Sequence, residues 1–208
     1  MIWETARLTF RLRWKMILRP SALPVLPALR RYATSSIQQH PISPGPTSPV
    51  ARGTAFELLT LRMLRRHGLS LRRVGGADDR GVDLRGQWDF CSTTRPMAPS
   101  LPAIVQCKDY ETARAGPALI RELEGTAARE SPGTVAVFAC SAGFSQAAVA
   151  AAFASLTPIA LVVVAETGIS RMTLNRALTA AIPGLVVYKG SGGLIELWLD
   201  TSMISVPD

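Results

Sequence analysis

Histidine and cysteine are scarce in this chain of 208 residues, which contains two histidines and three cysteines. The cysteines, Cys91, Cys107 and Cys140, are odd in number and lack the paired spacing of metal ligands. Both features argue against a disulfide scaffold and against a zinc ribbon. One histidine, His40, lies in a basic N-terminal stretch. A Ser-His-Asp triad or a histidine-rich metal site would therefore depend on His67 alone.

Acidic residues are nearly absent from the N-terminal quarter. Residues 1–50 contain seven basic residues and one acidic residue, so six of the eight excess positive charges lie there. Residues 1–40 combine arginine with serine, threonine and separated apolar residues, which predicts a mitochondrial transit peptide and a protein of the mitochondrial matrix. The alternative is a basic arm that binds nucleic acid and is not removed. An unbroken apolar stretch is missing, which argues against a secretory signal peptide.

Residues 41–50 contain four prolines with glycine and serine between them, which predicts a linker, with one domain over 51–208. In that domain, strands that alternate with helices predict an α/β fold with a mixed β-sheet flanked by helices. The patterns predict helices over 53–67, 116–130, 144–155 and 171–182, and strands over 69–74, 82–90, 103–110, 134–140, 158–165, 185–188 and 194–199.

Residues 142–165 carry no charge, and a stretch of this length is one that a membrane span would need. Pro158 divides it into an alanine-rich helix and a β-branched strand. This division favours two elements of a globular domain, so no membrane span is expected.

The predicted strand over 82–90 contains an acid among apolar residues. Its alternation places Val82 and Leu84 on one face and Asp83 on the other. On the predicted strand over 103–110, Gln106 and Lys108 share a face and Cys107 points the opposite way, as a small core residue would.

Burying a carboxylate or an ammonium without a partner is costly, so these polar groups need partners. One interpretation is that Asp83, Gln106 and Lys108 share a Mg²⁺ ion, which prefers oxygen ligands. The alternatives are a buried ion pair between Asp83 and Lys108 without catalysis, and a hydrogen bond from Gln106 to the main chain.

The predicted helix over 53–67 carries one acid, Glu57, in its apolar stripe, beside Leu61 and Leu64 on the helical wheel. A buried acid that faces a sheet with its own acid and lysine suggests membership of the same metal site. The alternative is an ion pair with an arginine. Five further arginines form either a solvated face or contacts with nucleic-acid phosphates: Arg62, Arg65, Arg66, Arg72 and Arg73.

Four short motifs follow one another: G-T-A-F-E from Gly53, G-G-A-D-D-R-G-V-D-L from Gly75, V-Q-C-K from Val105 and S-A-G-F-S-Q-A-A from Ser141. In this order and spacing they resemble the Mrr-type (type IV) restriction endonuclease domain of the PD-(D/E)xK superfamily, over about residues 51–165. With its leader, the chain also resembles the fungal family named "required for respiratory growth protein 7". The resemblance implies a restriction-endonuclease-like core.

The resemblance also implies roles for residues. Asp83 matches the metal-binding aspartate, Gln106 and Lys108 match the Q-x-K segment, and Glu57 matches the acid of the first helix. Asp79 matches the acid of the preceding loop. Asp83, Gln106 and Glu57 would hold Mg²⁺, while Lys108 orients the attacking water or stabilises the anion. Gln106 stands where many nucleases have an acid, which removes a negative charge and should weaken Mg²⁺ binding.

The leading interpretation is a mitochondrial Mg²⁺-dependent endodeoxyribonuclease that binds and cleaves DNA, with a homodimer as an expected assembly. The alternative is a catalytically inactive nuclease fold that binds nucleic acid or assists assembly for respiratory growth. A third interpretation, a membrane-associated factor, requires a span over 142–165. Residues 51–121 have twelve basic and seven acidic residues, whereas 122–208 have four and seven. The positive excess therefore falls in the half with the candidate site.

Overall fold

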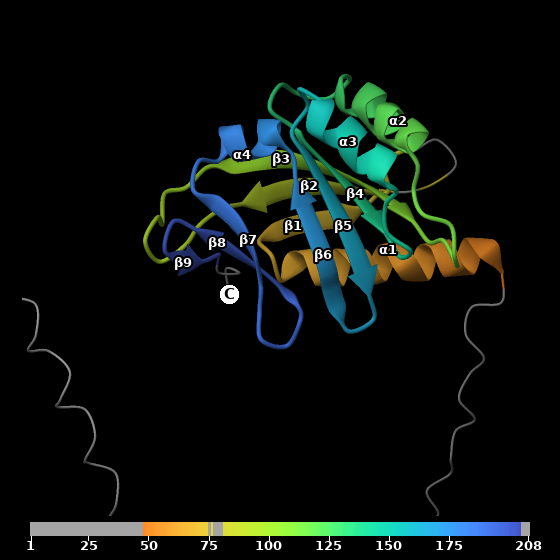
Figure 1. Cartoon of the computed structure of the whole chain (residues 1–208), viewed down its shortest axis with the longest axis horizontal. Helices are drawn as coiled ribbons and strands as arrows, with labels where there is room; N and C mark the ends of the chain where they lie inside the picture. Colours follow the sequence, from red (N-terminus) through yellow and green to blue (C-terminus); the bar gives the residue numbers. More distant parts are fainter. Residues whose placement is uncertain (1–47, 75, 77–80, 205–208) are drawn as a thin grey trace, which may run out of the picture. The chain divides into compact units, whose positions relative to one another are not determined.

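The computed structural model describes residues 48–74, 76 and 81–204. The predicted transit peptide, most of the predicted linker and Asp79 lie outside these residues. The described part contains four helices (Figure 1): α1 Pro49–Arg65, α2 Pro117–Ala127, α3 Gln146–Ala154 and α4 Arg176–Ala181. It contains nine strands: β1 Leu69–Arg73, β2 Leu84–Asp89, β3 Ser100–Lys108, β4 Val135–Cys140, β5 Ile159–Ala165, β6 Gly168–Leu174, β7 Leu185–Lys189, β8 Ile195–Leu199 and β9 Ser202–Met203.

The first helix begins within the last residues of the predicted linker. Ser48 caps it, because its hydroxyl oxygen accepts a hydrogen bond from the N–H of Ala51 at 3.1 Å. Pro49 follows at a position where its missing N–H costs nothing and its fixed backbone angle suits a helix. The last residues of the proline-rich stretch therefore form the start of the first helix of the domain.

The first six strands form one mixed sheet in sequence order, β1 to β6. The pairs β1–β2 and β2–β3 are antiparallel, β3–β4 and β4–β5 are parallel, and β6 returns antiparallel to β5. Two right-handed crossovers that advance in the same direction place their helices on one face. Figure 1 shows α2 and α3 together on that face, with α1 on the other. The predicted mixed β-sheet flanked by helices is confirmed.

Each face of this sheet has its own apolar core. On the α1 face, Leu64 packs with Leu84 and Trp88, and on the other face Ile120 packs with Phe138. All six residues of β4 are buried, as expected for a parallel strand covered on both sides. The faces thus provide two separate environments for side chains that alternate along one strand.

The prediction of a helix over 171–182 is wrong for its first part, which belongs to β6. Buried Asn175 separates β6 from α4. Its Oδ1 accepts hydrogen bonds from the N–H of Leu178 at 3.0 Å and of Ile159 at 2.9 Å. One side chain therefore caps α4 and holds the start of β5, and this long-range contact sets where the helix begins.

The charge-free stretch over 142–165 is divided between α3 and β5, as its proline indicated. Within the described residues, no helix is both long enough and apolar enough to cross a membrane.

The last three strands form a separate small sheet in the order β7–β8–β9. His67, after α1, joins this sheet to the main domain. Its Nε2 lies 3.0 Å from the carbonyl oxygen of Ile195, and its Nδ1 lies 3.0 Å from that of Met63. His67, the one histidine among the residues that the structure describes, is therefore a structural link.

Candidate active site

Asp83 lies in a bend directly before β2 and not inside the strand as the alternation predicted. Its N–H donates a hydrogen bond to the carbonyl oxygen of Val105 at 2.9 Å. Val82 and Leu84 lie in the cores on opposite faces of the sheet, so the prediction that they share a face is wrong. Side chains alternate between the two faces only within a regular strand. The bend at Asp83 interrupts this alternation directly before β2 begins at Leu84.

The carboxylate of Asp83 is held against β3. Its Oδ2 accepts a hydrogen bond from the N–H of Cys107 at 2.6 Å, which places it on the peptide that joins Gln106 to Cys107. A short contact to a carboxylate is typical of charge-assisted hydrogen bonds. The structure therefore brings Asp83 and the Q-x-K segment together, although 22 residues separate Asp83 from Val105 in the sequence.

Along β3 the side chains alternate as predicted. Ile104 lies in the core under α2 and α3, whereas Val105 and Cys107 pack on the α1 side. Gln106 and Lys108 therefore share the α2 face. Gln106 is 3% exposed and Lys108 is half-buried.

Gln106 contacts an acid that the sequence analysis did not single out. Its Nε2 donates to Oε1 of Glu122, on α2, at 3.5 Å, the long limit of a hydrogen bond. A Cβ added to Gly81, in the loop before Asp83, would lie 3.6 Å from Nε2 of Gln106 and 3.9 Å from Oε1 of Glu122. Gly81 thus lies against this pair. The only sequence signal for Glu122 was its place on the helix that crosses from β3 to β4.

Glu57 is largely buried on α1, as the helical wheel predicted, with 14% of its side chain exposed. It forms an ion pair and hydrogen bond with Nε of Arg73, at the end of β1. This is the alternative that the sequence left open. Because α1 covers the opposite face from α2, Glu57 and Gln106 approach β3 from opposite sides.

The Cys107 thiol lies among the candidate residues. Burial raises its pKa well above the ordinary value, and the carboxylates of Asp83 and Glu57 raise it further. The hydroxyl of Thr60, which makes no well-aligned hydrogen bond within the described residues, and the ammonium of Lys108 oppose this rise. A thiol that resists ionisation is a poor nucleophile, so Cys107 acts as a packing residue.

The donor groups near Asp83 suit a hard cation in their chemistry. Among the residues that the structure describes, no three His, Cys, Asp or Glu side chains gather closely enough to hold a metal ion. The carboxylate of Asp83 and the amide oxygen of Gln106 are nevertheless the oxygen donors that Mg²⁺ prefers. Oε1 of Gln106 accepts no hydrogen bond from the described residues, which fits a ligand. Glu57, held by Arg73, does not face this oxygen.

The five predicted phosphate-binding arginines are all exposed, but they do not form one compact patch. Arg72 and Arg73 end β1 beside Asp83, because the N–H of the next residue donates to the carbonyl oxygen of Asp83 at 2.8 Å. The eight helical steps of α1 from Glu57 to Arg65 span about 12 Å, so Arg65 lies away from this end. Arg62 and Arg66 also belong to that distant end of α1.

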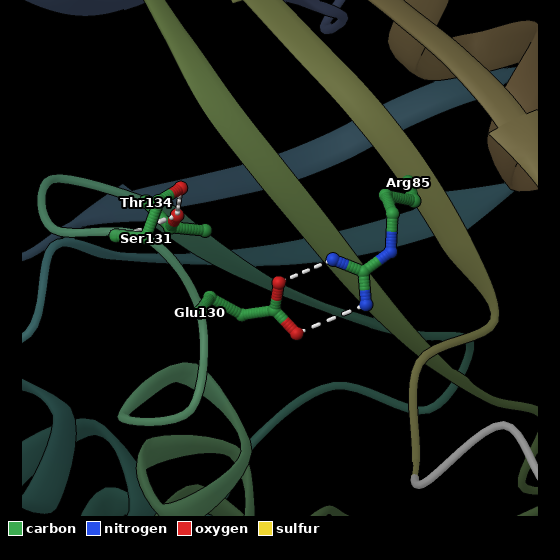
Figure 2. A network of polar contacts seen from close by, with 4 residues as sticks. All are labelled: Arg85, Glu130, Ser131 and Thr134. Carbon is green, nitrogen blue, oxygen red and sulfur yellow. Dashed lines mark hydrogen bonds and ion pairs between the residues drawn. The ribbon is translucent and has the colours of Figure 1, made fainter.

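Arg85 on β2 and Glu130 after α2 form a two-point ion pair, shown in Figure 2. Nη2 of Arg85 donates to Oε1 of Glu130 at 2.9 Å, and Nη1 donates to Oε2. These hydrogen bonds raise the pKa of Arg85 and lower that of Glu130. The pair ties β2 to the end of the helix that carries Glu122.

The motif that begins at Ser141 positions the end of β3. The hydroxyl of Ser141 accepts a hydrogen bond from the N–H of Tyr110 at 2.9 Å and donates to its carbonyl oxygen at 3.0 Å. Ser145 caps α3 by accepting from the N–H of Ala148 at 3.2 Å. These contacts hold the chain directly after Lys108 against the loop that follows β4.

Comparison with known proteins gives a family match over this region. The family model Mrr_cat, described as a restriction endonuclease, matches residues 51–166, more than half of the chain. A solved structure of the MspJI restriction endonuclease in complex with a 27-mer oligonucleotide is 24% identical, with a TM-score of 0.40. That match covers 56% of this chain and 26% of the other.

Three curated fungal relatives also match. An uncharacterized mitochondrial protein of Schizosaccharomyces pombe is 34% identical over 57% of this chain and 46% of its own length. The mitochondrial "required for respiratory growth protein 7" of Eremothecium gossypii is 36% identical over 38% of this chain and 46% of its own length. Its counterpart in Zygosaccharomyces rouxii is 31% identical over 41% and 50%.

The chain spans about half the length of these curated relatives. All three are mitochondrial by name, and the predicted mitochondrial location is confirmed by them.

Proposed function

The chain belongs to the restriction endonuclease family whose model covers more than half of it, and we propose that it hydrolyses DNA phosphodiester bonds with Mg²⁺ in the mitochondrial matrix. The observation that carries this proposal is the contact between Asp83 and the peptide after Gln106. This contact holds the Asp83 carboxylate at the main chain between Gln106 and Cys107, and it supports a site in which Asp83 acts with Gln106 and with Lys108, two residues further along the same face of β3.

The residues have distinct parts in the proposed reaction. Asp83 and Gln106 would hold a Mg²⁺ ion, whose chemistry is to lower the pKa of a bound water and to neutralise charge at the scissile phosphate. The N–H of Cys107 fixes the orientation of the Asp83 carboxylate. The ammonium of Lys108 would donate hydrogen bonds to the attacking water or to a phosphate oxygen as negative charge develops.

Exposed arginines are the proposed contacts to DNA. Arg62, Arg65, Arg66 and Arg72 form no ion pair with an acid within the described part of the chain, so their guanidinium groups are available to phosphates. Arg72 lies at the end of β1 near Asp83, whereas Arg62, Arg65 and Arg66, at the far end of α1, would contact phosphates further from the site. These groups position the DNA backbone and carry no base specificity.

The test uses the full chain with supercoiled plasmid, in Mg²⁺ or in chelator. We expect nicked and linear products with Mg²⁺ only, and their loss in Asp83→Asn, which keeps an oxygen that can accept from the N–H of Cys107. Circular dichroism of the variant checks that the fold is intact. Cleavage in chelator, or full activity of folded Asp83→Asn, would contradict the assignment.

A second candidate function is a nuclease fold without catalysis, acting in nucleic-acid binding or assembly for respiratory growth. The ion pair between Glu57 and Arg73 favours it, because an acid engaged by an arginine is not directed at a metal. Retention of plasmid in a mobility-shift assay, with no product at any Mg²⁺ concentration, would support this candidate over the nuclease.

A further inference from the structure

Gln106 and Glu122, two side chains that each carry an oxygen acceptor, meet on the α2 face of β3. Within the described residues, Glu122 forms no ion pair, and Oε1 of Gln106 accepts no hydrogen bond. These two side chains are linked by the 3.5 Å contact of Nε2 of Gln106 with the carboxylate of Glu122. Gln106 is 3% exposed as a residue, and the neighbouring Glu122, which is exposed, adds its negative charge to the potential at the amide oxygen. The arrangement suits a cation.

The position of Glu122 is built into the fold. Ile120 and Leu123 of α2 are buried in the core on this face, which fixes the rotation of the helix over β3. The pair Arg85–Glu130 then holds the end of α2 to β2. Glu122 is the acid that this rotation directs at Gln106.

The loop that leads to Asp83 closes over the same point. Gly81 has φ +81°, a left-handed conformation that glycine adopts without strain, and a Cβ added there would lie in ordinary van der Waals contact with Gln106 and Glu122. Two residues later, Asp83 binds the peptide that follows Gln106. Asp83 is thus held at the main chain of β3 beside Gln106, and Glu122 of α2 contacts the Gln106 side chain, so the segment before β2, β3 and α2 each contribute an oxygen-bearing side chain to this part of the domain.

From this arrangement we infer that Glu122 supplies, from α2, the carboxylate that the Q-x-K strand lacks, and that it completes a divalent-cation site with Asp83 and Gln106. The inference rests on the proposed Mg²⁺-dependent function and names a residue for it. Two carboxylates and an amide restore the negative charge that a glutamine in place of an acid removes. Charge count is a principal determinant of affinity for hard cations.

The experiment measures cation binding directly, without DNA or cleavage. The full chain is titrated with Mn²⁺, and the free ion is followed by electron paramagnetic resonance, with Mg²⁺ as competitor. Glu122→Gln is the test variant. Glu124→Gln is the matched control, because it makes the same change two residues away on the same helix. Asp83→Asn tests the cation site as a whole, and melting temperature checks that each variant is folded.

We expect Glu122→Gln to weaken Mn²⁺ binding by about tenfold or more, and Glu124→Gln to change it by less than about twofold. The exchange variant Gln106→Glu with Glu122→Gln keeps one acid and one amide, and should recover most of the lost affinity.

The outcomes separate this inference from the function on which it rests. If Asp83→Asn abolishes binding while Glu122→Gln binds like the wild type, the role of Glu122 is wrong and the cation site stands. An equal loss in Glu122→Gln and Glu124→Gln would also overturn it, because a general charge effect would then explain the change. If the wild-type chain binds no Mn²⁺, or Asp83→Asn binds it unchanged, both the inference and the Mg²⁺-dependent site are overturned.

Discussion

The two faces of β3 differ in what surrounds neighbouring residues of one strand. On the α1 side, Cys107 packs against the apolar core, and Glu57 of α1 is neutralised by Arg73. On the α2 side, Gln106 lies beside Glu122, which has no cationic partner within the described part of the chain. On the α1 face, Glu57 is therefore paired with an arginine. On the α2 face, Gln106 and Glu122 retain oxygen acceptors that are available to a ligand.

This difference shows how a sheet can separate stability from chemistry at single-residue spacing. Asp83 is the residue that belongs to both faces, because it binds the peptide between Gln106 and Cys107 and also raises the pKa of the Cys107 thiol. A change on the α1 face should affect mainly folding, and a change on the α2 face should affect mainly the reaction.

The largest expected contrast is between Lys108→Ala and Cys107→Ala, adjacent residues on opposite faces of β3. We expect Lys108→Ala to reduce Mg²⁺-dependent cleavage by about 10³-fold, since it removes the cation that stabilises developing charge. Cys107→Ala removes a small packing group and should leave cleavage within about threefold. Single-turnover rates at saturating Mg²⁺ measure both. A comparable loss in the two variants would mean that the faces are not functionally distinct.

The second largest expected effect is on stability, when one core residue on each face of the sheet is truncated. Leu64 on α1 and Ile120 on α2 are both fully buried, in separate cores. Each substitution by alanine should lower the free energy of unfolding by about 2–5 kcal/mol, from lost burial and the cavity left behind. Urea denaturation followed by tryptophan fluorescence gives both values. A negligible cost on either side would show that this face does not contribute a packed core.

The smallest effect concerns the ion pair that ties α2 to β2. The hydrogen bond with Arg85 lowers the pKa of Glu130 in the folded chain, so its stabilisation is present above the ordinary glutamate pKa and is lost as pH falls through the lowered value. We expect Glu130→Gln to cost about 0.5–1 kcal/mol near neutral pH, because partial exposure of Arg85 screens the pair.

The measurement for this variant is urea denaturation of both proteins near neutral pH and in acid. The stability difference should shrink as pH falls through the lowered pKa of Glu130, because protonation of the folded state then removes the ion pair. A difference that stays constant across this range would assign the effect to packing rather than charge.

Much of the fold follows from local patterns. The alternation of apolar residues predicted β3 and the face shared by Gln106 and Lys108, and the wheel around Glu57 predicted its burial. These features depend on periods of two and 3.6 residues, which are visible along the chain. The order of the four short motifs predicted the restriction-endonuclease-like core, and the family match over residues 51–166 agrees with this prediction.

Other features depend on partners that are distant in the sequence. The bend at Asp83 exists because its backbone and side chain bind β3, and α4 starts where Asn175 binds the entry of β5. The partner of Glu57 was one arginine among several, and only the packing of α1 beside β1 selected Arg73. No local period encodes such contacts.

The sequence by itself determined the alternating strands and helices, the mixed sheet, and Asp83, Gln106 and Lys108 as the candidate residues for chemistry. Only the tertiary structure decided that Glu57 is engaged by an arginine and that Glu122 contacts Gln106. The physical reason is that side-chain periodicity specifies which face a residue occupies. The residue that it meets there is decided by the packing of a second element, and that packing depends on the whole core.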